Sequence, residues 1–271
     1  MSTFKYKDRE IYYDASGEGK PILLLNGIMM SCTSWDAFVP SFTKYNTLLR
    51  LDFIDQGNSA RWDEDYTQEE QVEVIYALFQ ELKIDKATIM GVSYGGEVGM
   101  KFAIKYPEYV DRLILANTSA QTSNWLRDIG HCWNKVGESL DGEAYYDLAI
   151  PVIYSPSYYE RREEWMNNRR KILVPLFSTK EFQSRMKRLV NSAENHNCKE
   201  ELEKIEAPTL IISSQYDFLT PLHEQEFLAK RIKNAQHVII PDCGHASMYE
   251  QPMLFTSLVL GFANVLSEYK I

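Results

Sequence analysis

The sequence lacks the features of nucleic-acid-binding, membrane and exported proteins. Its 271 residues carry 29 basic against 38 acidic side chains, a net charge of −9 that disfavours nucleic acid or an anionic membrane as the main partner. No apolar run approaches the roughly 20 residues that span a bilayer. The N-terminal stretch has no apolar signal-peptide core. We therefore expect a cytoplasmic protein without membrane or nucleic-acid partners.

Cysteine is also scarce. Cys32, Cys132, Cys198 and Cys243 form neither a C-x-x-C pair nor a zinc-finger spacing. The sequence thus predicts free thiols in a reducing compartment, with no metal and no organic cofactor. Cys243 and His245 could form a metal site or a thiol nucleophile, an alternative that competes with another use of His245 given below. We find no internal repeat and no low-complexity segment.

Short apolar runs alternate with amphipathic ones along most of the chain. This alternation is typical of an α/β fold with a mostly parallel central sheet and helices on both faces. The predicted strands are 11–14, 21–26, 46–52, 87–90, 110–117, 207–214 and 236–241. The predicted helices are 68–82, 96–103, 221–231 and 251–266.

Residues 120–200 break this pattern, because they lack buried strands and are rich in tryptophan and tyrosine. We interpret them as a helical cap subdomain inserted over the sheet, between two parts of a core domain, 1–119 and 201–271. The alternative is an ordinary run of surface helices that does not form a cap. The arginine pairs Arg161-Arg162 and Arg169-Arg170 are expected on a solvated face rather than in an anion site.

Residues 91–95 read G-x-S-x-G, the turn that presents a nucleophilic serine between a strand and a helix. The preceding residues are apolar and β-prone, and the following ones favour a helix. Small residues are needed on both sides of Ser93 because the backbone there is strained and the helix approaches the strand closely. A plain glycine-rich turn is the alternative interpretation.

A serine hydroxyl needs a base within hydrogen-bond reach, and the base needs an orienting acid. His245 follows the last predicted strand, and Asp217 follows the strand before it. On this architecture the order along the chain is Ser, acid, His, which favours Ser93, Asp217 and His245 as the catalytic residues. Asp242 competes with Asp217, being nearer to His245 in sequence.

The tetrahedral intermediate of acyl transfer requires two backbone N–H groups. Tyr94 should supply one, because it follows the nucleophile at a helix N-terminus. The loop after the strand at 21–26 should supply the other, with Ile28 the first choice and Met29 the second. Gly27 would let the backbone turn inward.

Together these residues resemble the α/β-hydrolase superfamily over nearly the whole chain. Residues 52–59 look like its D-x-R-G-x-G-x-S loop, and residues 106–115 look like its Y-P-E-x-V-x-x-L-V-L segment. Trp35-Asp36 is similar to the start of its first helix after the oxyanion loop. The resemblance implies a helical cap between the sixth and seventh strands.

Two departures stand out. Asn26-Gly27 replaces the usual His-Gly and is similar, in its Asn alone, to the N-S-L-G of 3-oxoadipate enol-lactonases. The loop at 52–57 lacks the usual Arg and the first Gly.

The function expected from these features is a serine hydrolase that cleaves small esters or lactones with an apolar acyl part, through an acyl-enzyme. An acyl-carrier or CoA thioesterase, a C–C bond hydrolase, or a non-hydrolytic enzyme of this fold are alternatives. A receptor-like binding protein with vestigial activity is another. We expect a monomer or homodimer that binds a small-molecule substrate. The candidate pocket residues are Asn26, Gly27, Met29, Met30 and Trp125.

Overall fold

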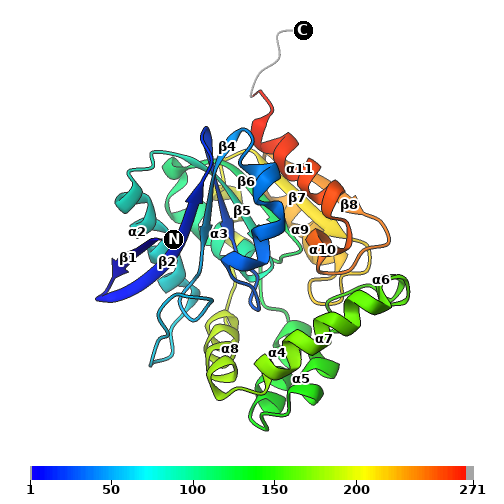
Figure 1. The fold of residues 1–271 in the computed structure, drawn as a ribbon. Coiled ribbons are helices and arrows are strands. Elements are labelled where there is room, and N and C mark those ends of the chain that lie inside the picture. Colours follow the sequence, from blue (N-terminus) through cyan, green and yellow to red (C-terminus); the bar gives the residue numbers. More distant parts are fainter. Residues whose placement is uncertain (1, 267–271) are drawn as a thin grey trace.

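The computed structural model describes residues 2–266 and contains an eight-stranded sheet, in the order β1-β2-β4-β3-β5-β6-β7-β8 (Figure 1). Strands β1 and β2 pair antiparallel, as do β2 and β4, and the remaining neighbours are parallel. The predicted α/β fold with a mostly parallel sheet is therefore confirmed. The strands are β1 (Ser2–Tyr6), β2 (Arg9–Ser16), β3 (Lys20–Leu25), β4 (Asn46–Leu51), β5 (Ala87–Val92), β6 (Val110–Ala116), β7 (Thr209–Ser214) and β8 (Ala235–Ile240).

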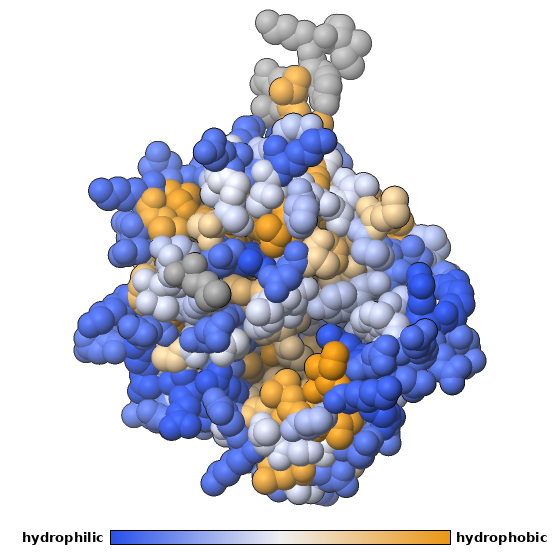
Figure 2. All heavy atoms as spheres, viewed as in Figure 1, coloured by the Kyte–Doolittle hydropathy of each residue, from blue (hydrophilic) through white to orange (hydrophobic). Residues whose placement is uncertain are grey.

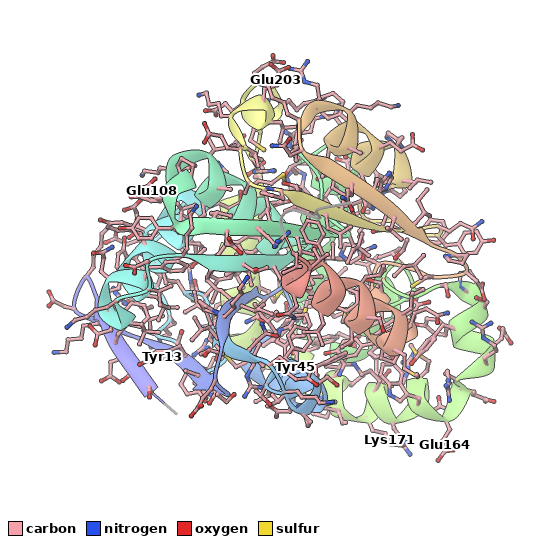
Figure 3. The ribbon with its side chains drawn as sticks, turned by 90° about the horizontal axis from the view of Figure 1, so that it is seen from above. Tyr13, Tyr45, Glu108, Glu164, Lys171 and Glu203 are labelled. Carbon is pink, nitrogen blue, oxygen red and sulfur yellow. The ribbon has the colours of Figure 1, made fainter. Side chains whose placement is uncertain are left out.

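Helices cover both faces of the sheet. Seen from above, α1 and α11 lie on one face, and α2, α3 and α9 lie on the other (Figure 3). The bounds of these helices are α1 (Val39–Phe42), α2 (Gln68–Leu82), α3 (Tyr94–Lys105), α9 (Leu222–Arg231) and α11 (Pro252–Asn264), with the short α10 (Ser247–Glu250) before the last. Short 3-10 helices span Cys32–Phe38, Pro107–Tyr109 and Lys199–Lys204.

The central strands have no exposed face, which explains their continuous apolar sequences. Every residue of β5 and β7 is buried, and Leu23, Leu24 and Leu25 of β3 have no exposed surface. Strands covered by helices on both sides need apolar residues at successive positions, not at alternate ones. The outer strand β8 is only partly buried. The central parallel strands are therefore buried along their length, and the candidate catalytic residues follow the carboxyl ends of parallel strands.

Five helices occupy the segment between β6 and β7, at the end of the sheet where Ser93 lies (Figure 1). They are α4 (Asn124–Gly137), α5 (Gly142–Ala149), α6 (Pro156–Arg161), α7 (Glu163–Phe177) and α8 (Lys180–Ala193). We call them the helical insertion. They fall inside the 120–200 boundaries given above, and the division of the chain into a core domain and a separate cap subdomain stays a prediction.

The two ends of the helical insertion meet in a short antiparallel contact. Gln121 and Asn197 form an isolated β-bridge. Beside it, the N–H of Thr122 donates to the carbonyl of His196 at 2.9 Å, and the N–H of Cys198 donates to the carbonyl of Ala120 at 2.8 Å. The chain therefore leaves and re-enters the sheet region at one place.

Candidate active site

Ser93 sits in the sharp turn between β5 and α3. Its φ of 53° and ψ of −121° lie outside the regions that residues with a side chain normally adopt. The glycines on either side make the turn possible: a Cβ on Gly91 would lie 2.3 Å from the Gly95 carbonyl oxygen, and one on Gly95 would lie 2.3 Å from that of Leu25. The G-x-S-x-G sequence is thus explained by contacts too close for any side chain.

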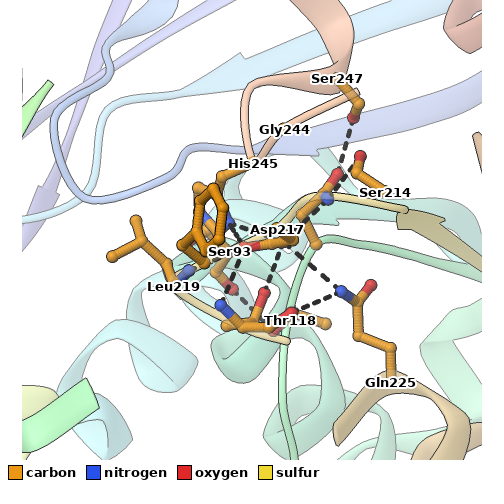
Figure 4. A network of polar contacts seen from close by, with 12 residues as sticks. Ser93, Thr118, Ser214, Asp217, Leu219, Gln225, Gly244, His245 and Ser247 are labelled. Carbon is orange, nitrogen blue, oxygen red and sulfur yellow. Dashed lines mark hydrogen bonds and ion pairs between the residues drawn. The ribbon is translucent and has the colours of Figure 1, made fainter. Parts of the chain in front are cut away.

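His245 and Asp217 form a buried pair beside this turn. His245 Nδ1 lies 2.9 Å from each carboxylate oxygen of Asp217. The Asp217 side chain is fully buried, and that of His245 is 9% exposed. Ser93 and His245 line the same cavity. Figure 4 shows Ser93, Asp217 and His245 meeting from three loops that follow three different strands. The structure therefore brings together the three side chains predicted to be catalytic.

Hydrogen-bond donors keep Asp217 in its charged form. The N–H groups of Leu219 and Thr220 donate to Oδ1 at 3.0 and 2.9 Å, and the Thr220 hydroxyl donates to Oδ2 at 2.9 Å. Burial opposes ionisation, but His245 and these donors outweigh it, so the pKa of Asp217 lies below its ordinary value. A carboxylate at this place can fix the tautomer of His245 and stabilise its protonated form.

Asn117 was not predicted from the sequence, yet it joins the ends of β6 and β7 to the start of α10. Its Nδ2 donates to Ser214 Oγ at 2.8 Å and to Asp217 Oδ2 at 2.9 Å, and its Oδ1 accepts from Ser247 Oγ at 2.7 Å (Figure 4). Asn117 has a positive φ of 49°, which asparagine tolerates better than most residues. Its place as the last residue of a predicted strand was the available signal.

Asp242 and Cys243, the residues of the two competing interpretations, do not have the contacts or the ionisation state that those roles require. Asp242 accepts hydrogen bonds from Ser157 and, at 2.7 Å, from Arg161, and its side chain is substantially exposed. It therefore does not orient His245. The Cys243 thiol is buried, and burial raises its pKa to about 12, which keeps it protonated at neutral pH. A protonated thiol is a poor nucleophile and a poor metal ligand.

The loop after β3 lies against Ser93. A Cβ placed on Gly27 would be 3.7 Å from Ser93 Cβ, and Gln56 holds the loop by donating to the carbonyls of Gly27 and Ile28 at 2.9 and 3.4 Å. Tyr94 begins α3, so its N–H is among those without a partner inside the helix. This arrangement suits an oxyanion hole made by Ile28 and Tyr94, which stays a prediction.

Two predicted pocket residues, Asn26 and Trp125, are not among those that line the cavity. Asn26 is buried below the loop, where its Nδ2 donates to the Leu51 carbonyl at 2.8 Å and its Oδ1 accepts from Trp35 Nε1 at 2.8 Å. Trp125 is 56% exposed and donates to the Phe218 carbonyl at 2.6 Å. Both predictions differ from the structure because backbone carbonyls outside the cavity satisfy these polar groups.

The cavity at Ser93 lies between the sheet and the helical insertion and has a volume of about 140 Å³. The core contributes Gly27, Met29 and Met30, as predicted from their place in the loop. The insertion contributes mainly apolar side chains, including Leu126, Trp133, Leu173 and Phe177. In Figure 2, apolar residues gather in the lower part of the view, where the insertion lies. Such walls suit a small apolar group.

Arg169 is the clearest departure from the sequence-based expectation of solvated arginines. It lines the cavity, with its Cζ 5.2 Å from the ring centroid of Tyr249 and 5.7 Å from that of Trp165. Its neighbour Arg170 instead forms ion pairs at the surface. The helical spacing of Trp165, Arg169 and Leu173, at i, i+4 and i+8, could have indicated an inward face.

The loop at 52–59, which departs from the family pattern, is linked to the helical insertion by an ion pair. Asp55 occupies the place of the missing glycine and has a positive φ of 66°. Its side chain is fully buried and accepts hydrogen bonds from Nε and Nη2 of Arg188, on α8, at 2.9 and 2.6 Å. The strained backbone is thus tied to a buried ion pair with the insertion.

Within residues 2–266, no group of three or more His, Cys, Asp or Glu side chains has an arrangement that could hold a metal ion. Over the same residues, every helix is too short or too polar to cross a bilayer.

Comparison with known proteins agrees with this geometry. A family model described as the alpha/beta hydrolase fold matches residues 20–252. The chain belongs to the α/β-hydrolase family. MGS-M2, an alpha/beta hydrolase enzyme from a Medee basin deep-sea metagenome library, has a solved structure that is 49% identical, with a TM-score of 0.97 and complete coverage of both chains. The family resemblance drawn from the sequence, and the coarser prediction of a hydrolase, are therefore confirmed.

More distant relatives of this α/β hydrolase carry varied names. The 2-hydroxy-6-oxo-6-(2'-aminophenyl)hexa-2,4-dienoic acid hydrolase of Metapseudomonas resinovorans is 22% identical over 257 residues, covering 93% of this chain and 87% of that protein. The enol-lactonase from Burkholderia xenovorans LB400 is 23% identical, with a TM-score of 0.85 over 96% of this chain and 99% of that one. Similarity at this level shows the fold and leaves the substrate to be argued from the site.

Proposed function

We propose that this α/β hydrolase cleaves small carboxylic esters or lactones with Ser93 as its nucleophile. The observation that carries the proposal is the buried pair of Asp217 and His245, of which His245 lines the cavity together with Ser93. A serine in a strained turn, a histidine and an acid that orients the histidine are the three groups that acyl transfer requires.

The proposed reaction has two halves. Ser93 Oγ attacks the acyl carbon, and His245 Nε2 accepts the hydroxyl proton while the N–H groups of Ile28 and Tyr94 stabilise the oxyanion. The bond to the alcohol then breaks, and His245 gives its proton to the leaving oxygen. A water molecule, deprotonated by His245, attacks the acyl-enzyme and releases the acid with Ser93 restored. Asp217 accepts from Nδ1 throughout, which leaves Nε2 free to exchange the proton.

The cavity favours a small substrate with an apolar part. Its volume is about 140 Å³, and Met29 and Met30 provide adaptable apolar surface beside Ser93. The name of the Burkholderia relative, an enol-lactonase, supports including lactones in the proposal.

The test is hydrolysis of 4-nitrophenyl esters of increasing acyl length, with one thioester and one 1,3-diketone to cover the alternative reactions. The wild type is compared with Ser93→Ala and with Ser184→Ala, a serine on the outer side of α8 whose hydroxyl donates to a backbone carbonyl. We expect ester turnover that Ser93→Ala abolishes and Ser184→Ala keeps. If no substrate turns over and a fluorophosphonate probe leaves Ser93 unlabelled, the proposal is wrong and ligand binding becomes the better reading.

A further inference from the structure

The cavity contains a permanently charged group for which the proposed ester chemistry has no use. Arg169 lies in the wall of the cavity that Ser93 and His245 also line. Among residues 2–266, no carboxylate lies within ion-pair distance of its guanidinium, and Arg169 Nε is buried without a hydrogen-bond partner. Its surroundings are the aromatic rings of Trp165 and Tyr249.

A buried cation without a counter-charge is unfavourable unless something compensates it. The aromatic rings offset part of this through cation–π contacts, and the hydroxyls of Tyr154 and Tyr249 are hydrogen-bond partners of the guanidinium, but they supply no negative charge and leave Nε without a partner. An anion that enters the cavity would satisfy both the charge and the donors. Arginine presents its N–H groups in a planar fork that matches a carboxylate with two parallel hydrogen bonds.

The other basic side chains of the cavity wall already have partners. Arg127 donates to Asn124 Oδ1 at 2.9 Å and to the Glu194 carbonyl at 3.4 Å. His131 lies 3.3 Å from the Glu194 carboxylate. Among the described basic side chains of the cavity wall, Arg169 is the one with a buried N–H group, Nε, that has no hydrogen-bond partner. The planar fork of its guanidinium matches a carboxylate, which carries one negative charge and two coplanar oxygens.

We infer that Arg169 binds a carboxylate carried by the substrate, so that the substrates are monoanionic esters or lactones of acids with a second carboxyl group. The inference rests on the proposed function, because it assumes that the molecule held by Arg169 reaches Ser93. The carboxylate can belong to the acyl part or to the alcohol part of the substrate, and the two arms of the experiment separate these cases.

The experiment uses pairs of substrates that differ only in charge. The acyl arm compares monomethyl succinate with dimethyl succinate, followed by methanol release, because methoxide is too poor a leaving group for the free carboxylate to expel it, and the alcohol arm compares 4-acetoxybenzoate with methyl 4-acetoxybenzoate. For each pair, the ratio of kcat/KM for the acid to that for the neutral ester is measured. Charge-assisted hydrogen bonds of this kind lead us to expect a wild-type ratio of about 10 to 100 in one arm.

The variants are Arg169→Gln and Arg169→Lys, with Arg161→Gln as the matched control, since Arg161 pairs with Asp242 on the outside. Arg169→Gln should bring the ratio close to one, mainly through a higher KM for the acid, and Arg169→Lys should keep part of it. Arg161→Gln should keep the wild-type ratio. Circular dichroism checks that each variant is folded.

A binding measurement separates this inference from the proposed function. Calorimetry with succinate and with benzoate, on Ser93→Ala protein with and without Arg169→Gln, reports carboxylate binding without turnover. Binding that disappears with Arg169→Gln supports the inference even if the ester chemistry fails. Equal rates for acid and neutral ester in both arms of the wild type, or an equal loss on both members of a pair in Arg169→Gln, would overturn it.

Discussion

Replacing Glu97 with glutamine should remove a pH dependence from the stability of the protein. Glu97 lies on α3, is 4% exposed, and accepts a hydrogen bond from Gln68 Nε2 at 2.5 Å. Burial raises its pKa from 4.5 to about 8, and the Gln68 donor and the charge of Lys101 lower it only in part. The carboxyl group is therefore protonated in the folded protein at pH values where it is ionised in the unfolded chain.

The sign of the effect follows from proton binding. Between pH 4.5 and about 8 the folded state holds a proton that the unfolded state has lost, so the free energy of unfolding falls as the pH rises. This contribution is complete below pH 4.5 and disappears as the pH passes through about 8. Since one pKa unit corresponds to roughly 1.4 kcal/mol, the loss between about pH 5 and about pH 8.5 amounts to about 4 kcal/mol.

Urea unfolding followed by tryptophan fluorescence, over a series of pH values, measures this contribution. The free energy of unfolding of Glu97→Gln minus that of the wild type should rise by about 4 kcal/mol across the range, because the neutral amide does not titrate. Glu108→Gln is the matched control, since Glu108 is exposed (Figure 3). A difference between wild type and Glu97→Gln that stays constant with pH would refute the reasoning.

Three further predictions concern backbone packing, the candidate acid and the ion pair of the insertion. Gly95→Ala should lower stability in urea unfolding by about 1–3 kcal/mol, since its Cβ would lie 2.3 Å from a backbone oxygen, whereas Gly261→Ala, which meets nothing within 4 Å, should not. Asp217→Asn should lower kcat by about four orders of magnitude. The wild type has a stabilising contribution from Asp217 above about pH 4, which it loses as the pH falls through the lowered pKa of this carboxyl group, and Asp217→Asn should lack it. The same acid-unfolding curve for wild type and variant would contradict this. Arg188→Met should cost about 3–5 kcal/mol by leaving the Asp55 carboxylate buried and unpaired, and adding Asp55→Asn should restore part of that loss; equal stability of single and double variants would oppose it.

The sequence predicted those parts of the fold that depend on local patterns. The helix predicted at 68–82 has the same bounds in the structure, and the buried strands differ by a few residues at their ends. Their signals are periodicity and continuous apolar runs, which report burial directly. The loops that follow the strands of a parallel sheet converge at one edge, so the chain order of Ser93, Asp217 and His245 also predicted that they meet.

The cavity wall was predicted less well, because its members are chosen by contacts between distant segments. Arg169 and Arg170 are identical and adjacent, yet one faces the cavity and the other pairs with acidic groups outside. Trp125 combines an aromatic ring with an N–H donor, and an available carbonyl of Phe218 holds it away from the cavity. Asn117 depends on three partners from two other parts of the chain, 214–217 and 247. Which side chain faces the cavity depends on tertiary contacts, and the spacing of residues along the sequence does not report them.

The bridge between Gln121 and Asn197 has a consequence for how this protein can change. Because the ends of the helical insertion are already paired, its removal or exchange leaves a gap that a short turn can close, at little additional loop-closure entropy. The sheet would keep its strand order and the turn at Ser93. The helices that shape the cavity can thus be exchanged as a unit, with a change in substrate preference, provided that the new helices again supply a partner for the buried Asp55 carboxylate.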